Sequence, residues 1–135
     1  MSFAWTEDLS TGVADIDSQH KELISRVNAL IAACNEDKDR DEIGRYLGFL
    51  HEYIAFHFAA EEREMAGRGY PGLAAHEAQH EHFKKQVNDL YQQFTAHGAS
   101  IQVVLMTIHA SGTWLVNHID RTDKELAAFL KKQRE

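Results

Sequence analysis

Two pairs of metal-binding side chains stand in the middle of the sequence. His57 precedes Glu61 by four residues, and His76 precedes His80 by four. Residues four apart lie on nearly the same face of an α-helix, so each pair can direct two ligands at one point. A Tyr-Pro-Gly turn at 70–72, which contains the only proline, separates the two pairs. The pattern predicts two antiparallel helices whose four side chains converge on a metal ion.

The nine histidines divide by helical geometry into candidate ligands and surface residues. At about 100° per residue, three of them are rotated away from the ligand faces: His51, His82 and His109. His97 precedes Gly98 at a predicted helix end, where a histidine commonly interacts with free carbonyls. The other five fall on or beside apolar stripes: His20, His57, His76, His80 and His118. Five buried imidazoles need a common partner, and a metal centre would supply one.

Two carboxylates compete for a place beside His118. Asp123 follows His118 by five residues, which displaces the two side chains by about 140° in a regular helix. If both bind metal, the backbone between them must widen in a π-like turn, or the helix must end there. Asp123 could instead be solvated or cap a tail helix, and Asp120 competes for any ligand role.

The elements that must position these residues are helices. Apolar residues at three- and four-residue spacing predict four of them, approximately over 18–35, 40–66, 71–97 and 100–119. Asp17 is the expected N-cap of the first helix, Asp39 and Glu42 resemble a capping box, and Ser100 can cap the fourth helix. The remaining segments are an expected extended arm over 1–16 and a short helical tail over 121–132. Trp5 anchors the arm in this interpretation. Short loops favour an all-α, up-down-up-down four-helix bundle, in one domain spanning 1–135.

The composition narrows the possible partners. A formal charge of −7 argues against nucleic acid or an anionic membrane surface as a partner, because both need a basic patch. The single Cys34 excludes an intramolecular disulfide and fits a reducing compartment. The first residues show no signal-peptide pattern, and no stretch approaches the ~18 apolar residues of a membrane span. A soluble cytoplasmic protein is expected.

Four motifs in order along the chain together resemble the hemerythrin family, in its single-domain bacterial form. They are D-x-x-H at 17–20, H-F-x-x-E-E at 57–62, Y-P followed by H-x-x-x-H-x-x-F at 76–83, and W-L-x-x-H-I-x-x-x-D at 114–123. The resemblance covers nearly the whole chain. The combination is far more specific than any one H-x-x-x-H pair.

The resemblance implies a non-haem di-iron centre that binds O2 reversibly. One iron would be held by His76, His80 and His118. The other would be held by His20 and His57, and would keep the open position for O2. Glu61 and Asp123 would bridge the two irons together with an oxo or hydroxo group, so the family favours Asp123 over Asp120.

Candidate walls of an O2 pocket lie one turn from the implied ligands. They are Ile24, Ile54, Trp114 and Leu115. Leu115 matches the family position that closes over bound O2. Each of these residues is also suited to the core, and the two roles are compatible.

The ligand chemistry favours an oxygen carrier over an enzyme. Carboxylate-rich di-iron oxidases use several glutamates, whereas only two carboxylates lie on the ligand faces here. Glu62 and Glu64 point away from the face of Glu61 and are expected to be solvent exposed. We therefore expect O2 storage, delivery or supply, with an unknown protein partner. An O2, redox or nitric-oxide sensing module acting through a partner, and a di-iron peroxidase or iron oxidase, remain as alternatives.

Overall fold

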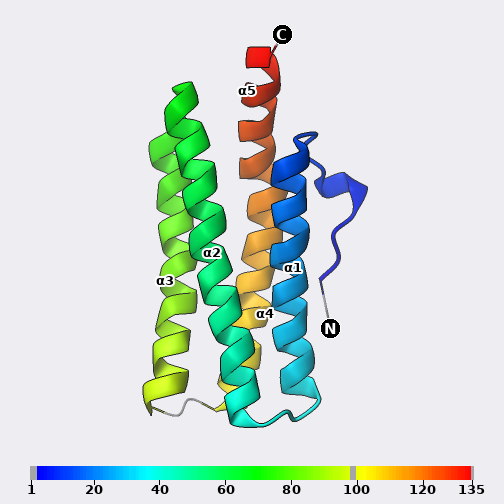
Figure 1. Ribbon diagram of the computed structural model, residues 1–135, viewed down its shortest axis with the longest axis vertical. Coiled ribbons are helices and arrows are strands. Elements are labelled where there is room, and N and C mark those ends of the chain that lie inside the picture. The colour runs from blue at the N-terminus through cyan, green and yellow to red at the C-terminus, as the bar shows by residue number, and fades with distance from the viewer. Residues whose placement is uncertain (1–2, 98–99, 135) are drawn as a thin grey trace.

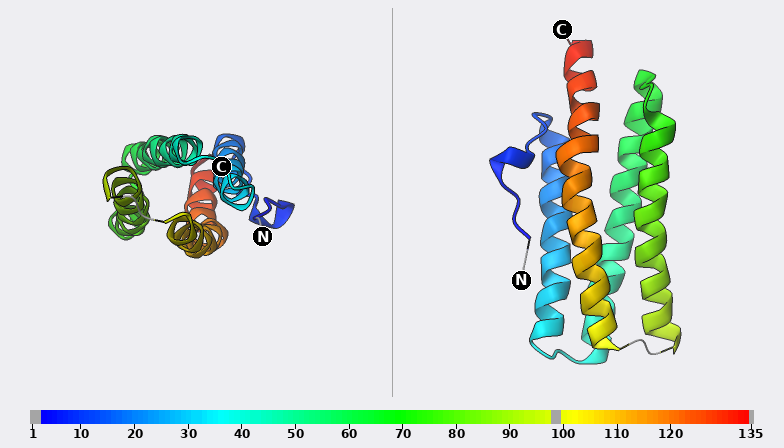
Figure 2. Two further views of the ribbon diagram at one scale, coloured as in Figure 1. Left: turned by 90° about the horizontal axis from the view of Figure 1, so that it is seen from below. Right: turned by 180° about the vertical axis from the view of Figure 1, so that it is seen from behind.

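Four long helices lie side by side in the computed structural model, which describes residues 3–97 and 100–134 (Figure 1). Their bounds are Ala14–Asn35 for α1, Arg40–Arg68 for α2, Leu73–His97 for α3 and Ile101–His118 for α4. A π-helical turn, Ile119–Asp123, continues α4 into α5, Lys124–Arg134. The described residues contain no strand, and the view along the helices in Figure 2 shows them arranged around a common interior. The predicted all-α four-helix bundle is confirmed.

Two apolar clusters fill the bundle, and they leave a polar layer between them. The larger cluster includes Leu23, Phe58, Phe83 and Ile119. The smaller one lies toward the end that carries α5, and consists of Val13, Ile16, Met65, Leu126, Ala127 and Leu130. On α2, Glu61 falls between Phe58 of the first cluster and Met65 of the second. The buried histidines and carboxylates therefore sit inside the protein with hydrophobic packing on both sides.

Local signals explain most of the helix boundaries. The side chain of Asp39 accepts a hydrogen bond from the Glu42 backbone N–H at 2.8 Å, and Ser100 accepts one from Val103 N–H at 3.2 Å. Both predicted N-caps are confirmed. Gly69 ends α2 in the left-handed conformation with φ of 66°, which glycine adopts without steric cost.

The predicted start of the first helix was wrong. The helix begins at Ala14, and Asp17 lies inside its first turn. The Asp17 carboxylate instead accepts hydrogen bonds from Ser10 Oγ at 2.7 Å and from the Thr11 backbone N–H at 2.8 Å. It therefore fixes the loop that precedes the helix. The third helix likewise begins at Leu73 rather than at 71, because the Pro-Gly pair forms the turn.

The N-terminal arm runs along the outside of α1 (Figure 1). Phe3 N–H donates to Asn28 Oδ1 at 2.8 Å, and Asn28 Nδ2 donates back to the Phe3 carbonyl at 2.6 Å. Trp5 packs against the core, with the Lys21 ammonium 4.4 Å from its ring. The described part of the arm contains one 3-10 turn, Glu7–Leu9. The arm ends where α1 begins, at Ala14, earlier than the predicted end at residue 16. Residues 1–2 of the predicted arm lie outside the described residues.

No helix in the described part of the chain is long and apolar enough to cross a membrane. The helix-end role expected of His97 depends on its side chain and on Gly98, which lie outside the described part.

Candidate metal centre

Every long helix contributes a ligand-type side chain to one buried layer. The residues are His20 on α1, His57 and Glu61 on α2, His76 and His80 on α3, His118 at the end of α4, and Asp123 in the π turn. None of the seven is more than 3% exposed. The structure therefore brings together all seven residues that the resemblance implied.

The ligand atoms of these residues form two overlapping groups, and within each group they lie no more than 4.8 Å apart. One group consists of Glu61, His76, His80, His118 and Asp123. The other consists of His20, His57, Glu61 and Asp123. Two carboxylates that belong to both groups are suited to bridge two cations, since each carboxylate has two oxygens.

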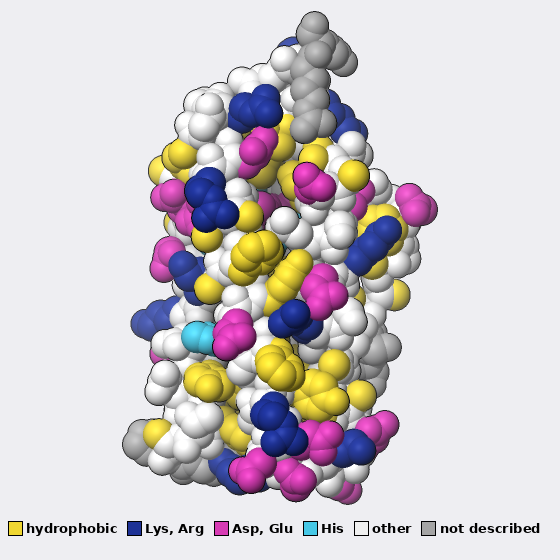
Figure 3. Space-filling model, viewed as in Figure 1, with side chains coloured by type: hydrophobic (Ala, Val, Ile, Leu, Met, Phe, Trp, Pro, Cys, Tyr) yellow, Lys and Arg dark blue, Asp and Glu magenta, His cyan; other side chains and the backbone are white. Residues whose placement is uncertain are grey.

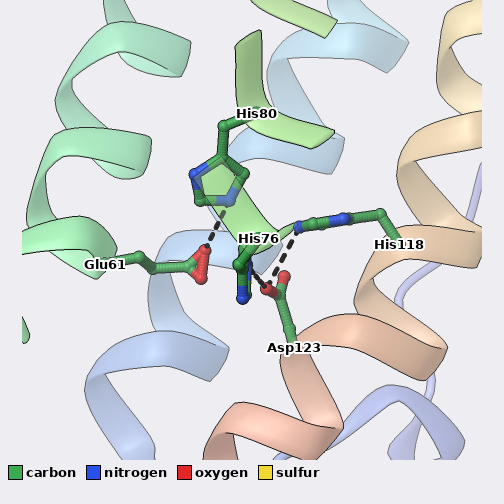
Figure 4. Close-up of side chains that lie close together, drawn as sticks. All are labelled: Glu61, His76, His80, His118 and Asp123. Carbon is green, nitrogen blue, oxygen red and sulfur yellow. Dashed lines mark ion pairs between the residues drawn. The ribbon is translucent and has the colours of Figure 1, made fainter. Parts of the chain in front are cut away.

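Asp123 divides its oxygens between the two groups. Oδ1 lies 2.9 Å from His76 Nε2 and 3.2 Å from His118 Nε2, whereas Oδ2 lies 2.8 Å from His20 Nε2. Figure 4 shows Glu61 reaching toward Asp123 from the opposite side, with its carboxylate beneath the His80 ring. The nearest Glu61 oxygen lies 3.3 Å from His57 Nε2 and 3.5 Å from His80 Nε2. Each carboxylate thus contacts both sets of imidazoles.

The polar atoms of this layer are buried without hydrogen-bond partners of acceptable geometry. They include the Nε2 atoms of all five histidines, all four carboxylate oxygens, and the Nδ1 atoms of His20, His76 and His80. Leaving a buried polar group unsatisfied costs roughly 1–3 kcal/mol each. The short distances together with poor mutual alignment mean that the atoms are directed at common points rather than at one another. A pair of metal ions at these points would satisfy the Nε2 atoms and the carboxylate oxygens, so the residues fit such a group.

The electrostatics of the layer favour an ionised Asp123. Burial opposes its ionisation, but the close imidazoles of His118, His20 and His76 hold its pKa well below the ordinary value. Burial alone would lower the pKa of His20, and contact with Asp123 outweighs it, so that this pKa is raised. The carboxylate is therefore in the form that binds a cation.

The π turn is what brings Asp123 onto the ligand face. It spans Ile119–Asp123, and because its turn is wider, each residue rotates by less than in a regular helix, which brings a five-residue separation closer to one full turn. Asp120 is exposed on this turn and pairs with Lys124 Nζ at 2.9 Å. Of the two carboxylates that the sequence left in competition, Asp123 joins the cluster and Asp120 faces solvent.

Two glutamines contact the outer nitrogen of a candidate ligand. Gln19 Oε1 lies 2.7 Å from His57 Nδ1, and Gln79 Oε1 lies 2.7 Å from His118 Nδ1. Thr122 Oγ1 donates to the same Gln79 oxygen at 2.9 Å. Because an amide oxygen only accepts hydrogen bonds, each Nδ1 carries the proton and each Nε2 is left free for a metal.

The sequence interpretation missed both glutamines and misplaced one glutamate. Each glutamine directly precedes a candidate ligand, at positions 19 and 79, but contacts a histidine on another helix. Their adjacency to His20 and His80 was the only available signal. Glu62 was expected to be exposed, yet its side chain is only 20% exposed and lies 3.7 Å from His80 Nδ1. Glu64 is 43% exposed and pairs with Arg68, in keeping with its predicted surface position.

Aromatic and aliphatic side chains enclose the layer. Phe58 stacks on His80 with ring centroids 3.8 Å apart, and Trp114 stacks on His118 at 5.0 Å. Ile24, Ile54 and Leu115 are buried in the larger apolar cluster, which Trp114 covers from outside. Their role as walls of an O2 pocket stays a prediction.

The histidines excluded on helical geometry lie elsewhere. His51 contacts Asn88 at 3.1 Å and stacks on Tyr91. His82 lies beside Trp114, and His109 beside Phe3. None of the three belongs to either group of ligand atoms.

The fold and the site define a class of protein: four-helix bundles with a buried pair of histidine and carboxylate clusters suited to two cations. Residues 11–130 match the family model described as the hemerythrin HHE cation binding domain. The chain belongs to the hemerythrin family.

Named relatives and solved structures agree with this family. The chain is 37% identical over 121 residues to a bacteriohemerythrin of Methylococcus capsulatus, covering 89% of this chain and 90% of that protein. It is 36% identical to a bacteriohemerythrin of Stenotrophomonas maltophilia, over 94% of this chain and 80% of that protein. A crystal structure of wild-type hemerythrin superposes with a TM-score of 0.86 at 36% identity, covering 93% of this chain and 95% of the other.

Proposed function

We propose that the protein binds O2 reversibly at a non-haem di-iron centre. In this proposal His76, His80 and His118 hold one iron, and His20 and His57 hold the other. Glu61 and Asp123 bridge the irons, together with an oxo or hydroxo group. The observation that carries the proposal is that the two groups of ligand atoms overlap in these two carboxylates and in no other residue.

The types of ligand in the layer suit iron, and the two metal positions differ in their number of histidines. Imidazole nitrogen with carboxylate oxygen matches non-haem iron, whereas a structural zinc site is a single closed tetrahedron. The group with three histidines is richer in ligands than the group with two. The position near His20 and His57 is therefore the one with room for a small ligand. When bound, the iron pair supplies two electrons to O2 and recovers them on release.

The surrounding residues provide what a reversible carrier needs. Ile24, Ile54 and Leu115 keep water away from the layer, because all three are buried aliphatic side chains. Gln19 and Gln79 fix the orientation of one histidine at each metal position. The layer offers only two carboxylates to two irons, which stabilises high-valent iron less than the glutamate-rich sites of oxidases do. A role in oxygen storage, delivery or supply is therefore part of the proposal, rather than enzymatic oxidation.

The proposal is tested by measuring how much iron and how much O2 each chain binds. Apoprotein is reconstituted with Fe(II) without air, desalted, and titrated with O2 in a closed cell. We expect about two irons and one O2 bound per chain, with the O2 recovered under argon. Sustained consumption of O2 or peroxide with an added reductant would instead indicate an enzyme and would overturn the proposal.

A further inference from the structure

A surface pocket of about 200 Å³ leads from solvent toward the candidate metal centre. It is lined by residues of α1, α2 and α5, with apolar walls that include Ile16, Ala60 and Leu126. Acidic, basic and hydrophobic side chains are interspersed over the face that Figure 3 shows, near the end of the bundle that carries α5. The O2 pocket residues expected from the sequence do not line this pocket. This pocket is therefore distinct from the predicted O2 pocket.

The lining residues that adjoin the candidate metal centre are Gln19, which contacts His57, and Glu61, which belongs to both groups of ligand atoms. Glu61 is only 3% exposed, and neither of its oxygens has a hydrogen-bond partner. Gln19 holds His57 through the 2.7 Å contact to Nδ1. The pocket thus ends on a buried, unsatisfied carboxylate beside the metal position of His20 and His57.

The outer part of the pocket is acidic. Asp15 is exposed there and forms no ion pair within residues 3–97 and 100–134. Glu64 also lines the pocket, and its single ion pair is with the exposed Arg68, at 3.4 Å. The charged residues of the outer lining, Asp15 and Glu64, are both carboxylates, and the neighbouring cations are Arg68, which pairs with Glu64, and Lys131, whose Nζ lies beside Gly12. A dication is attracted to such a rim over several ångströms.

A second pocket, of about 150 Å³, reaches the centre from the other side but carries the opposite charge. It is lined by Gln79, Trp114, Asn117, His118, Arg121 and Thr122. Among the described residues that line it, Arg121 is the only charged one when His118 is neutral, so a dication is repelled there. Of the two pockets, only the acidic one combines an attractive rim with an anionic inner end.

We propose that the acidic pocket is the route by which Fe(II) reaches the metal centre, with Asp15 and Glu64 concentrating the cation and Glu61 receiving it. This inference rests on the proposed iron-binding function. It gives a role in iron loading to Asp15 and Glu64, which bind neither metal nor O2 in the assembled centre. Glu61 receives the cation and remains as a ligand.

The charge on the rim is tested with the variant Asp15→Asn/Glu64→Gln. Apoprotein is mixed with Fe(II) without air, quenched with excess chelator at set times, desalted and assayed for iron. At low ionic strength we expect loading to slow by roughly tenfold, because the rim changes from attractive to repulsive. In 0.5 M salt the effect should largely vanish, because exposed charges are then screened within a few ångströms.

A matched control makes the same change of net charge elsewhere. Asp41 and Glu52 line a groove between α2 and α3 that contains no candidate ligand. The variant Asp41→Asn/Glu52→Gln should load iron at the wild-type rate. Equal slowing in both double variants would show a general effect of net charge and would overturn the proposal.

The steric part of the route is tested by filling the pocket without changing its charge. Ala60→Leu places a larger side chain in the pocket wall, and Ala55→Leu makes the same substitution at an exposed position facing a different groove. Ala60→Leu should slow loading severalfold while reaching the same final iron content, and Ala55→Leu should not. Wild-type rates in both Ala60→Leu and the rim variant would exclude this route while leaving the metal centre intact. Failure of the wild-type protein to retain any iron would instead reject the proposed function itself.

Discussion

The Nδ1 atom of His118, at the end of α4, lies 2.7 Å from Oε1 of Gln79 on α3. Gln19 on α1 stands in the same relation to His57 on α2, also at 2.7 Å. The two histidines belong to different groups of ligand atoms. Each proposed iron therefore has one imidazole whose tautomer and orientation are set by a glutamine from a neighbouring helix.

Removing one of these acceptors should weaken iron binding without removing a ligand. For Gln79→Ala we expect about a 10- to 100-fold loss of iron affinity, the usual effect of losing such a contact. Gln79→Glu keeps an acceptor at the same distance and should restore most of the affinity. Competition with a chelator of known affinity measures the change. Gln86→Ala, at an exposed position of α3, is the control. If Gln79→Ala bound iron as tightly as this control, the glutamine would have no role at the centre.

The π turn predicts that two nearby aspartates differ in their importance for iron binding. Asp123→Ala should abolish the di-iron centre, because Asp123 alone contacts histidines of both groups through different oxygens. Asp120→Ala should keep about two irons per chain, since it removes only a surface pair with Lys124. Iron content after anaerobic reconstitution distinguishes the two variants. Similar losses in both would reject Asp123 as a bridge.

Leu115 is expected to protect the oxygenated centre. It is buried three residues before His118, and Leu115→Ala would open space for water beside the ligands. We expect faster autoxidation, followed as the rate at which the oxygenated absorption decays in air. Leu47→Ala removes an equally buried leucine from the same cluster, at a comparable cost of ~2–5 kcal/mol in stability. An autoxidation rate for Leu115→Ala no higher than that of Leu47→Ala would assign Leu115 to packing alone.

Asp17 should contribute pH-dependent stability to the apoprotein. Burial opposes its ionisation, but hydrogen bonds from Thr11 and Ser10 lower its pKa below the ordinary value of 3.8. Because the folded pKa is the lower one, the stabilisation is present above pH 3.8 and is lost as the pH falls through the folded pKa. Asp17→Asn should reduce the free energy of unfolding at pH 7 by roughly 1.5–3 kcal/mol, the scale of hydrogen bonds to a charged group.

The pH dependence of that difference is the sharper check. Urea unfolding of the wild-type apoprotein and of Asp17→Asn should give values that converge below pH 3.8. A difference that stayed constant from pH 7 to pH 3 would mean that the charge of Asp17 has no part in holding the loop.

The helices and the ligand positions could be predicted because their signals are local. Four-residue spacing places His57 and Glu61 on one face whatever surrounds them, and apolar periodicity identifies the face that is buried. For the five-residue separation of His118 and Asp123, a widened turn was one of the two backbone arrangements expected if both residues bind metal, and it is the one that the structure contains.

The errors concern side chains whose partners come from distant parts of the sequence or from irregular backbone. Asp17 has the residue type of an N-cap, but the folded loop offers it Ser10 and Thr11 as donors, and the helix starts earlier. Gln19 and Gln79 contact histidines 38 and 39 residues away. No helical period encodes such pairs, because they depend on how the helices pack.

The most direct test of the central claim is a cycle of oxygenation followed by visible absorption. Protein loaded with Fe(II) without air should be nearly colourless, gain a charge-transfer band on exposure to air, and lose it when O2 is removed under argon. We predict that the band returns with nearly full amplitude over several cycles. Irreversible conversion to a diferric form on the first exposure would contradict reversible O2 binding.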